Sequence, residues 1–239
     1  MLSSDHIHQL ATKHQTTELN ILREYFQHLF LSYLYQHPET NSILFKGGTA
    51  LRIIHHSPRF SEDLDFSAPK LSTHHIEQAL QKTLIDLQKE NVNPQLEEAK
   101  TTSGGYLAAI SFASPIGTIR VLVEISKRQR NSAEQAVTIV NDFIPPYTLI
   151  GLASDQLVAE KITALQTRQK PRDFFDLYFI LRANLLSPKQ KHILHQIVPL
   201  LEKSHLNFET ELKQFLPKSH WPIIRNFPTT LKQEINQFI

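Results

Sequence analysis

Hydrophobic and polar positions alternate along this chain with two periods, and the period changes from segment to segment. Apolar residues recur at helical spacing over residues 17–35 and again over 76–87, which predicts two amphipathic helices. The first of these should end near His37-Pro38, because the residue before a proline disfavours helical backbone.

The segments between these helices carry the shorter period. Two glycines, Gly47-Gly48, stop a brief apolar run, and helical spacing resumes after them at 49–56. The turn 114–117 separates two alternating segments and predicts a hairpin. Strands are expected at residues 42–45, 60–66, 95–100, 106–113 and 118–126.

The pattern changes after Pro145-Pro146, since nearly every segment beyond residue 154 has helical spacing. Helices are expected at residues 155–168, 172–183 and 188–201, followed by shorter ones. We therefore predict a small α/β domain followed by a helical domain, with the boundary near residues 145–154.

Composition narrows the class of protein. With 239 residues, 41% hydrophobic and 20% charged, the chain has an ordinary globular composition. It has no cysteine, which excludes disulfides, thiolate metal sites and cysteine nucleophiles. Residues 1–15 are polar and no apolar stretch is long enough for a bilayer, so we expect a cytoplasmic protein without membrane contact. The net charge of +2 means that any nucleic acid would have to meet local basic patches.

The Gly47-Gly48 pair is the first candidate for chemistry. A strand that ends in two glycines and opens into a helix can bring backbone N–H groups close to phosphate oxygens. Taken alone, the same pair is also explained as a simple turn.

Asp63 and Asp65 lie two residues apart in the alternating segment, so they should share one face while Leu64 and Phe66 point into the core. Two neighbouring carboxylates repel, and a divalent cation removes the repulsion. Mg²⁺ prefers carboxylate, water and phosphate oxygens, and it serves phosphoryl displacement. The alternative is a solvated edge strand.

Glu124 is a candidate for a third carboxylate. In the segment 119–126 the odd-numbered positions are apolar, which places Glu124 on the face opposite Val121, Val123 and Ile125. An exposed strand glutamate would show the same pattern.

A second charged cluster lies in the helical half of the chain. Lys161 could neutralise phosphate charge, and Asp173 and Asp176 lie one turn apart on the same helix face. Capping alone would explain Asp173. A local basic strip is formed by Arg168, Lys170 and Arg172, for which a solvated helix face is the alternative.

These residues match a known pattern. Gly47-Gly48 with Asp63-Leu64-Asp65-Phe66 resembles the signature of the DNA polymerase β-type nucleotidyltransferase superfamily. More narrowly, the segments 46–51 and 60–66 resemble the AbiEii/AbiGii toxin family, which includes the MenT toxins. The segments 123–126 and 160–177 match that family too, so the similarity spans residues 43 to about 181. The helices after Leu186 match no motif.

The resemblance implies a polymerase β-type α+β core with a small mixed or antiparallel sheet. Residues 1–150 would form the nucleotidyltransferase domain, and residues 151–239 a helical domain that completes the active-site cleft. Catalytic roles fall on Asp63, Asp65, Lys161 and Asp176, with Asp63 and Asp65 binding Mg²⁺, for which Mn²⁺ could substitute. The nucleoside triphosphate would be held by Gly47, Gly48, Thr49, Ser61 and Lys161, and Asp176 would position or activate the acceptor hydroxyl.

The function implied is that of a toxin from an abortive-infection or toxin–antitoxin pair. Such a toxin transfers a nucleotide from a nucleoside triphosphate to RNA, as MenT-type members do at the tRNA 3′ end, and blocks translation. An AbiEi-like antitoxin is the implied partner. The best candidates for RNA contacts are Lys127, Arg128, Arg130, Arg168 and Arg172. A small-molecule or protein acceptor, or an inactive nucleotide-binding module, are the alternatives. The preferred triphosphate, the antitoxin mechanism and the oligomeric state are left open by the sequence.

Overall fold

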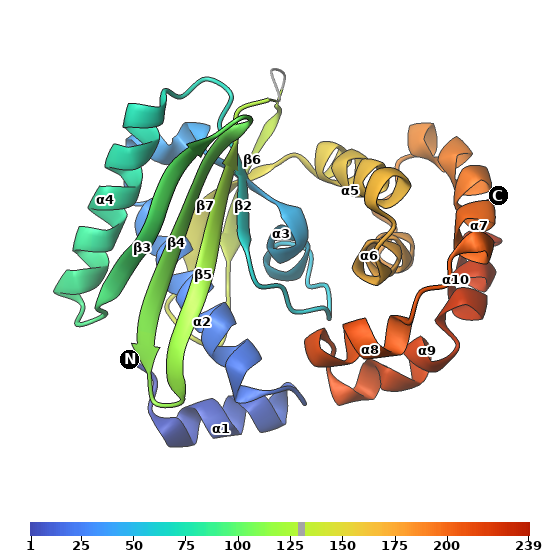
Figure 1. Ribbon diagram of the computed structural model, residues 1–239, viewed down its shortest axis with the longest axis horizontal. Helices are drawn as coiled ribbons and strands as arrows, with labels where there is room; N and C mark the ends of the chain where they lie inside the picture. The colour runs from blue at the N-terminus through green and yellow to red at the C-terminus, as the bar shows by residue number, and fades with distance from the viewer. Residues whose placement is uncertain (129–131) are drawn as a thin grey trace. The chain divides into compact units, whose positions relative to one another are not determined.

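The computed structural model describes residues 1–128 and 132–239 (Figure 1). Its internal contacts divide the chain into two compact units. Unit 1 comprises Met1–His56 and Phe60–Leu152, and unit 2 comprises Ser57–Arg59 and Ala153–Ile239. The chain therefore passes between the units three times, because three residues just upstream of the paired aspartates belong to unit 2.

A seven-stranded sheet forms the centre of unit 1, with the strand order β3-β4-β5-β2-β1-β7-β6. The pairs β2–β5 and β1–β7 are parallel, and the other neighbours are antiparallel. The sheet is therefore mixed, as predicted. The strands are β1 Leu44–Lys46, β2 Leu64–Ser67, β3 Pro94–Thr102, β4 Gly105–Ser114, β5 Gly117–Ser126, β6 Glu134–Ile139 and β7 Tyr147–Leu152.

The predicted strand at 60–66 is shifted in the structure. β2 starts only at Leu64, so Asp63 precedes the strand, and the strand continues to Ser67. Before Leu64 the backbone is bonded to side chains instead of to a strand, because Gln27 and Thr49 donate to the carbonyl oxygens of residues 61–63. The neighbour β1 is also short, since the chain turns into a helix at Gly47. The register Lys46↔Asp65 leaves no residue of β1 to pair with the segment before Leu64.

Helices α2 and α4 pack against the sheet of unit 1 (Figure 1). Ser3, Thr17 and Ser72 cap three of the helices through side-chain oxygens that accept backbone N–H groups. α2 lies in the core, where Phe26 stacks on Phe112 of β4 with ring centroids 4.4 Å apart. The helices are α1 Ser4–Lys13, α2 Glu18–Leu34, α3 Gly47–Ile53 and α4 Thr73–Lys89.

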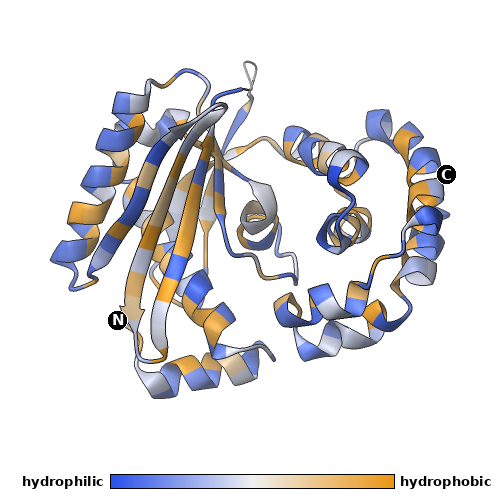
Figure 2. Ribbon diagram, in the orientation of Figure 1, coloured by the Kyte–Doolittle hydropathy of each residue, from blue (hydrophilic) through white to orange (hydrophobic). Residues whose placement is uncertain are grey.

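The edge strand β3 and its inner neighbour β4 differ in hydropathy. Figure 2 shows the edge strand β3 as mostly hydrophilic and the neighbouring β4 as more hydrophobic, and most of β3 is exposed whereas most of β4 is buried. A polar edge strand discourages pairing with other chains.

Unit 2 is helical around an aromatic core in which Phe174, Phe175, Phe208 and Phe227 pack together. The predicted helix 188–201 begins as a 3₁₀ segment, Pro188–Ile193, before α7. The α-helices are α5 Ser154–Arg168, α6 Pro171–Arg182, α7 Leu194–Lys203, α8 Phe208–Leu212, α9 Trp221–Arg225 and α10 Phe227–Ile235. Among the described residues, no helix combines the length and apolarity needed to cross a membrane.

Candidate active site

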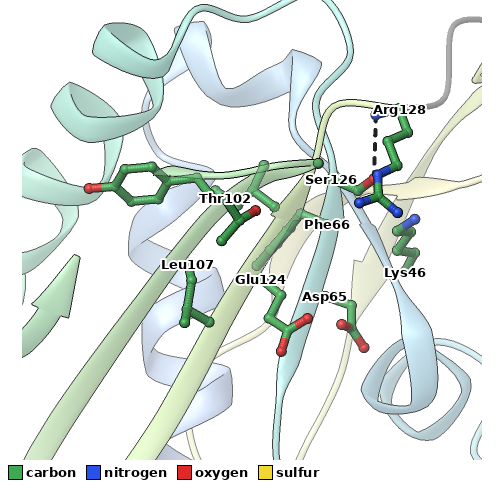
Figure 3. A pocket seen from close by; sticks show the side chains of 11 residues that line it. Lys46, Asp65, Phe66, Thr102, Leu107, Glu124, Ser126 and Arg128 are labelled. Atoms are coloured by element: carbon green, nitrogen blue, oxygen red, sulfur yellow. Dashed lines mark hydrogen bonds between the residues drawn. The ribbon is translucent and has the colours of Figure 1, made fainter. Parts of the chain in front are cut away.

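Two carboxylates stand next to each other on neighbouring strands of unit 1. β2 and β5 run parallel with Asp65 directly opposite Glu124. Leu64 and Phe66 are fully buried, as are Val123 and Ile125 to within 2%. The alternation of the strands therefore places both carboxylates on the other face. Figure 3 shows Asp65 and Glu124 side by side and pointing in the same direction.

Gly47 lies directly against Asp65. Its backbone has a φ of +82°, which only glycine adopts readily, and a Cβ built on it would lie 2.7 Å from Asp65 Cγ. The glycine turn and the aspartate are therefore in contact, which was the arrangement required by the hypothesis of a phosphate site beside a metal site.

Asp63 is held through its backbone. Its carbonyl oxygen accepts a hydrogen bond from the Thr49 hydroxyl, and Gln27 Nε2 donates to the carbonyl oxygens of Ser61 and Glu62, both at 3.0 Å. Gln27 is 1% exposed and Thr49 is fully buried. The hydroxyl expected to contact nucleotide thus serves the loop that leads into β2, and the supporting Gln27 was not foreseen from the sequence.

A pocket of about 370 Å³ opens over this face of unit 1. Asp65 and Glu124 lie toward one end of it, and Lys46 and Arg128 point toward each other near the other end (Figure 3). Asp63 does not line it. Its lining residues are Lys46, Asp65, Phe66, Thr102, Gly104, Tyr106, Leu107, Glu124, Ile125, Ser126 and Arg128.

The donor set suits a hard cation. Within residues 1–128 and 132–239 no three histidine, aspartate or glutamate side chains gather closely enough to form a protein-only metal site. Asp65 and Glu124 supply paired carboxylate oxygens. Mg²⁺ commonly takes only one or two carboxylates and completes its shell with water and substrate phosphates. The residues present therefore fit Mg²⁺ bound together with a triphosphate.

Unit 2 contains a buried cluster of three charges. Arg59 Nε and Nη2 donate to Oδ1 and Oδ2 of Asp176 at 2.8 and 3.0 Å, and Lys161 Nζ lies 2.9 Å from Oδ2. The side chains of Arg59, Lys161 and Asp176 are 4, 10 and 2% exposed. Burial by itself would raise the pKa of Asp176, but the two cations outweigh it and lower that pKa to about 2.

Both oxygens of Asp176 are therefore engaged by protein cations, and its low pKa makes it a weak proton acceptor. Arg59 was not foreseen as a functional residue. The signal available was its position four residues before Asp63, in a segment that is otherwise apolar or small.

The remaining predicted residues fall into different surroundings. Asp173 caps α6 by accepting from the Lys170 backbone N–H at 3.0 Å, and it also accepts from Arg168 Nε at 3.0 Å. Arg168 is thus paired within unit 2, while Arg172 Nε is buried without a hydrogen-bond partner. The predicted contact residue Arg130 lies outside the described residues.

Comparisons with known proteins give a family for the chain and solved structures with a similar fold. The family model described as "Nucleotidyl transferase AbiEii toxin, Type IV TA system" matches residues 29–233. The crystal structure of JHP933 from Helicobacter pylori has 18% identity and a TM-score of 0.66, with 93% of each chain covered. That of an H. pylori protein proposed to be a nucleotidyltransferase has 19% identity and a TM-score of 0.62, again with 93% of each chain covered. No curated protein sequence matches the chain.

The family match, together with paired carboxylates beside a glycine turn on a mixed sheet, defines the chain as a nucleotidyltransferase. More particularly, it belongs to the AbiEii toxin family of type IV toxin–antitoxin systems. Membership implies a nucleoside triphosphate substrate and an antitoxin encoded as its partner.

Proposed function

We propose that this chain is a Mg²⁺-dependent toxin that transfers a nucleotide from a nucleoside triphosphate to the 3′ end of tRNA, as MenT-type toxins do. Charging of the modified tRNA, and hence translation, would then be blocked. The observation that carries the proposal is the contact of Gly47 with Asp65, which itself stands opposite Glu124.

In this proposal Asp63 and Asp65 hold Mg²⁺ and Glu124 provides the third carboxylate. When bound, Mg²⁺ neutralises phosphate charge and orients the reacting oxygens. Asp65 and Glu124 are held in place by the buried residues on either side of them in the strands. Glu124 lies at the pocket surface, where it can accept the proton of an acceptor hydroxyl.

Gly47 and Gly48 provide close backbone approach to the triphosphate, and Ser61 precedes the carboxylates in the loop held by Gln27. Thr49 contributes by fixing the Asp63 backbone. Each of these groups acts by positioning, which is the main contribution a protein makes to phosphoryl transfer.

Lys161 is proposed to bind phosphate, and Asp176 is proposed to position the Lys161 side chain. Lys161 Nζ lies 2.9 Å from Asp176 Oδ2, so this buried carboxylate fixes the position of the ammonium group. Asp176 thus takes the role of a positioning residue in place of one that activates the acceptor.

RNA contacts are proposed at the basic residues near the pocket and on unit 2. Arg128 lines the pocket and Lys127 precedes it. Arg168 and Arg172 remain candidates on unit 2. An AbiEi-like antitoxin would be encoded alongside.

The decisive experiment incubates the purified chain with total RNA and each of the four α-labelled triphosphates in turn. We expect one triphosphate to label a tRNA-sized band in a Mg²⁺-dependent reaction. Asp65→Ala should abolish the label, whereas Asp5→Ala, which removes an exposed carboxylate from α1, should not. Pyrophosphate release with a panel of antibiotics but no labelled RNA would replace this function with small-molecule modification.

A further inference from the structure

The pocket that holds Asp65 and Glu124 has a second, basic end. Lys46 lies at the end of β1, directly before Gly47, and Arg128 follows β5 two residues after Ser126. Figure 3 shows the Lys46 amine and the Arg128 guanidinium pointing toward each other. Two cations directed at the same point of a pocket favour the binding of an anion there.

The backbone of this region fixes where the guanidinium lies. The Lys127 N–H donates to the Gly104 carbonyl at 2.8 Å, which extends the β4–β5 ladder by one step. The Arg128 N–H donates to Ser126 Oγ at 3.5 Å. The chain is therefore held on the sheet up to Arg128.

Gly104 makes room for the arginine. A Cβ built on Gly104 would lie 2.5 Å from Arg128 Cζ, so the guanidinium packs directly on the glycine backbone. The side chain folds back over the start of β4 to line the pocket, although Arg128 is an exposed residue. Gly47 and Gly104 therefore have the same role, because each leaves room for a charged side chain of this pocket. Gly47 leaves room for Asp65, and Gly104 leaves room for Arg128.

Among the residues that the structure describes, no carboxylate lies within 4 Å of the Arg128 guanidinium, whereas Arg120 on the same hairpin pairs with Glu97 at 3.0 Å. A planar guanidinium presents a fork of N–H donors that matches phosphate oxygens. Thr102 and Ser126 add hydroxyl groups to the lining.

We infer that Lys46 and Arg128 form a phosphate-binding subsite at the basic end of this pocket. The subsite shares the pocket with Asp65 and Glu124 and binds a phosphate group that takes part in the same reaction. The inference rests on the proposed nucleotidyl transfer. It assigns a role to Lys46, which directly precedes the glycine pair, and to Arg128, which lies outside the segments that resemble the family. The bound group is a phosphate, supplied either by the nucleoside triphosphate or by the backbone of the acceptor RNA.

Two binding measurements distinguish the sources. One titrates a non-hydrolysable α,β-methylene triphosphate with Mg²⁺ by calorimetry. The other titrates a fluorescent oligoribonucleotide by anisotropy at several salt concentrations, without triphosphate. Because a charge-assisted hydrogen bond is lost, Arg128→Ala and Lys46→Met should each lower the affinity for one of the two ligands by roughly tenfold to a hundredfold.

The matched control is Arg120→Ala, which removes an exposed arginine of β5 outside the pocket lining. It should change both affinities less than about twofold, the expected size for an exposed pair. If RNA is the source, Arg128→Ala should also reduce the slope of log affinity against log salt by about 0.7. Arg128→Lys should restore the charge but only part of the affinity.

Equal affinities of Arg128→Ala and Arg120→Ala in both titrations would overturn the subsite, as would a wild-type chain that binds neither ligand. Because both measurements report binding, they are independent of transfer. A chain that transfers no nucleotide to RNA but loses phosphate affinity in Arg128→Ala would refute the proposed function and leave the subsite standing.

Discussion

Replacing Asp176 by asparagine removes the one negative charge from a buried trio. Arg59 and Lys161 would then lie close together, 4 and 10% exposed, with an amide oxygen in place of a carboxylate. The fall of the Asp176 pKa from 3.8 to about 2 corresponds to about 2 kcal/mol in favour of the charged form. Breaking a buried ion pair by removing one partner typically costs about 3–5 kcal/mol. We expect Asp176→Asn to destabilise unit 2 by about 3 kcal/mol.

The chain carries its own probe for this measurement. Its single tryptophan, Trp221, belongs to unit 2 and donates to the Leu216 carbonyl at 3.3 Å. Tryptophan fluorescence during urea denaturation therefore reports on the unit that contains the trio. The matched control is Glu209→Gln, which breaks an exposed Glu209–Lys213 pair on the same unit and should leave the midpoint almost unchanged.

The interaction itself is isolated by a double-mutant cycle. If Asp176 acts through Arg59, the pair Asp176→Asn and Arg59→Met should together cost less than the sum of the two single changes. Strict additivity, or a loss below about 1 kcal/mol in Asp176→Asn, would refute the reasoning that this carboxylate holds the two cations. Because its folded pKa is depressed, the contribution should be present above pH 4 and lost as the pH falls toward 2.

Three further predictions concern unit 1. Glu124→Gln should lower transfer at least about 100-fold with the fold intact, whereas Glu134→Gln, on the edge strand β6, should leave the labelling rate unchanged. Gly47→Ala should abolish labelling because its Cβ meets Asp65, while Gly117→Ala, with a φ of +118° but nothing within 4 Å, controls for backbone strain alone. Burial lowers the pKa of His28 to about 4, so the unfolded chain takes up its proton first as the pH falls. Stability of unit 1 should therefore drop by about 3 kcal/mol between pH 6.5 and 4, measured by circular dichroism in urea, and His28→Gln should remove this slope.

The sequence was sufficient for the elements with a clear period. The helix at 17–35 and the hairpin around 114–117 were predicted closely, because one face of each is buried and the apolar spacing records that face. The alternation around Glu124 likewise foretold its exposure. The spacing of apolar residues predicts an element wherever one face of that element packs against a continuous core.

The short strand β2 shows where such reasoning stops. Residues 60–63 alternate as a strand would, yet they have no regular structure. The carbonyl oxygens of Ser61, Glu62 and Asp63 accept hydrogen bonds from the side chains of Gln27 and Thr49 instead of from a strand. These donors lie 14 to 35 residues away in the sequence, so the pattern around the aspartates does not contain them.

By itself, the sequence determined that two aspartates, a glycine pair and a strand glutamate were available for phosphate and metal chemistry, since side-chain facing follows from local backbone geometry. Only the tertiary structure decided which groups meet: Asp65 opposite Glu124, Gly47 against Asp65, and Arg59 with Lys161 on Asp176. These contacts join residues up to 117 positions apart. They depend on strand order and helix packing, which are set by burial of the whole chain and not by any local spacing.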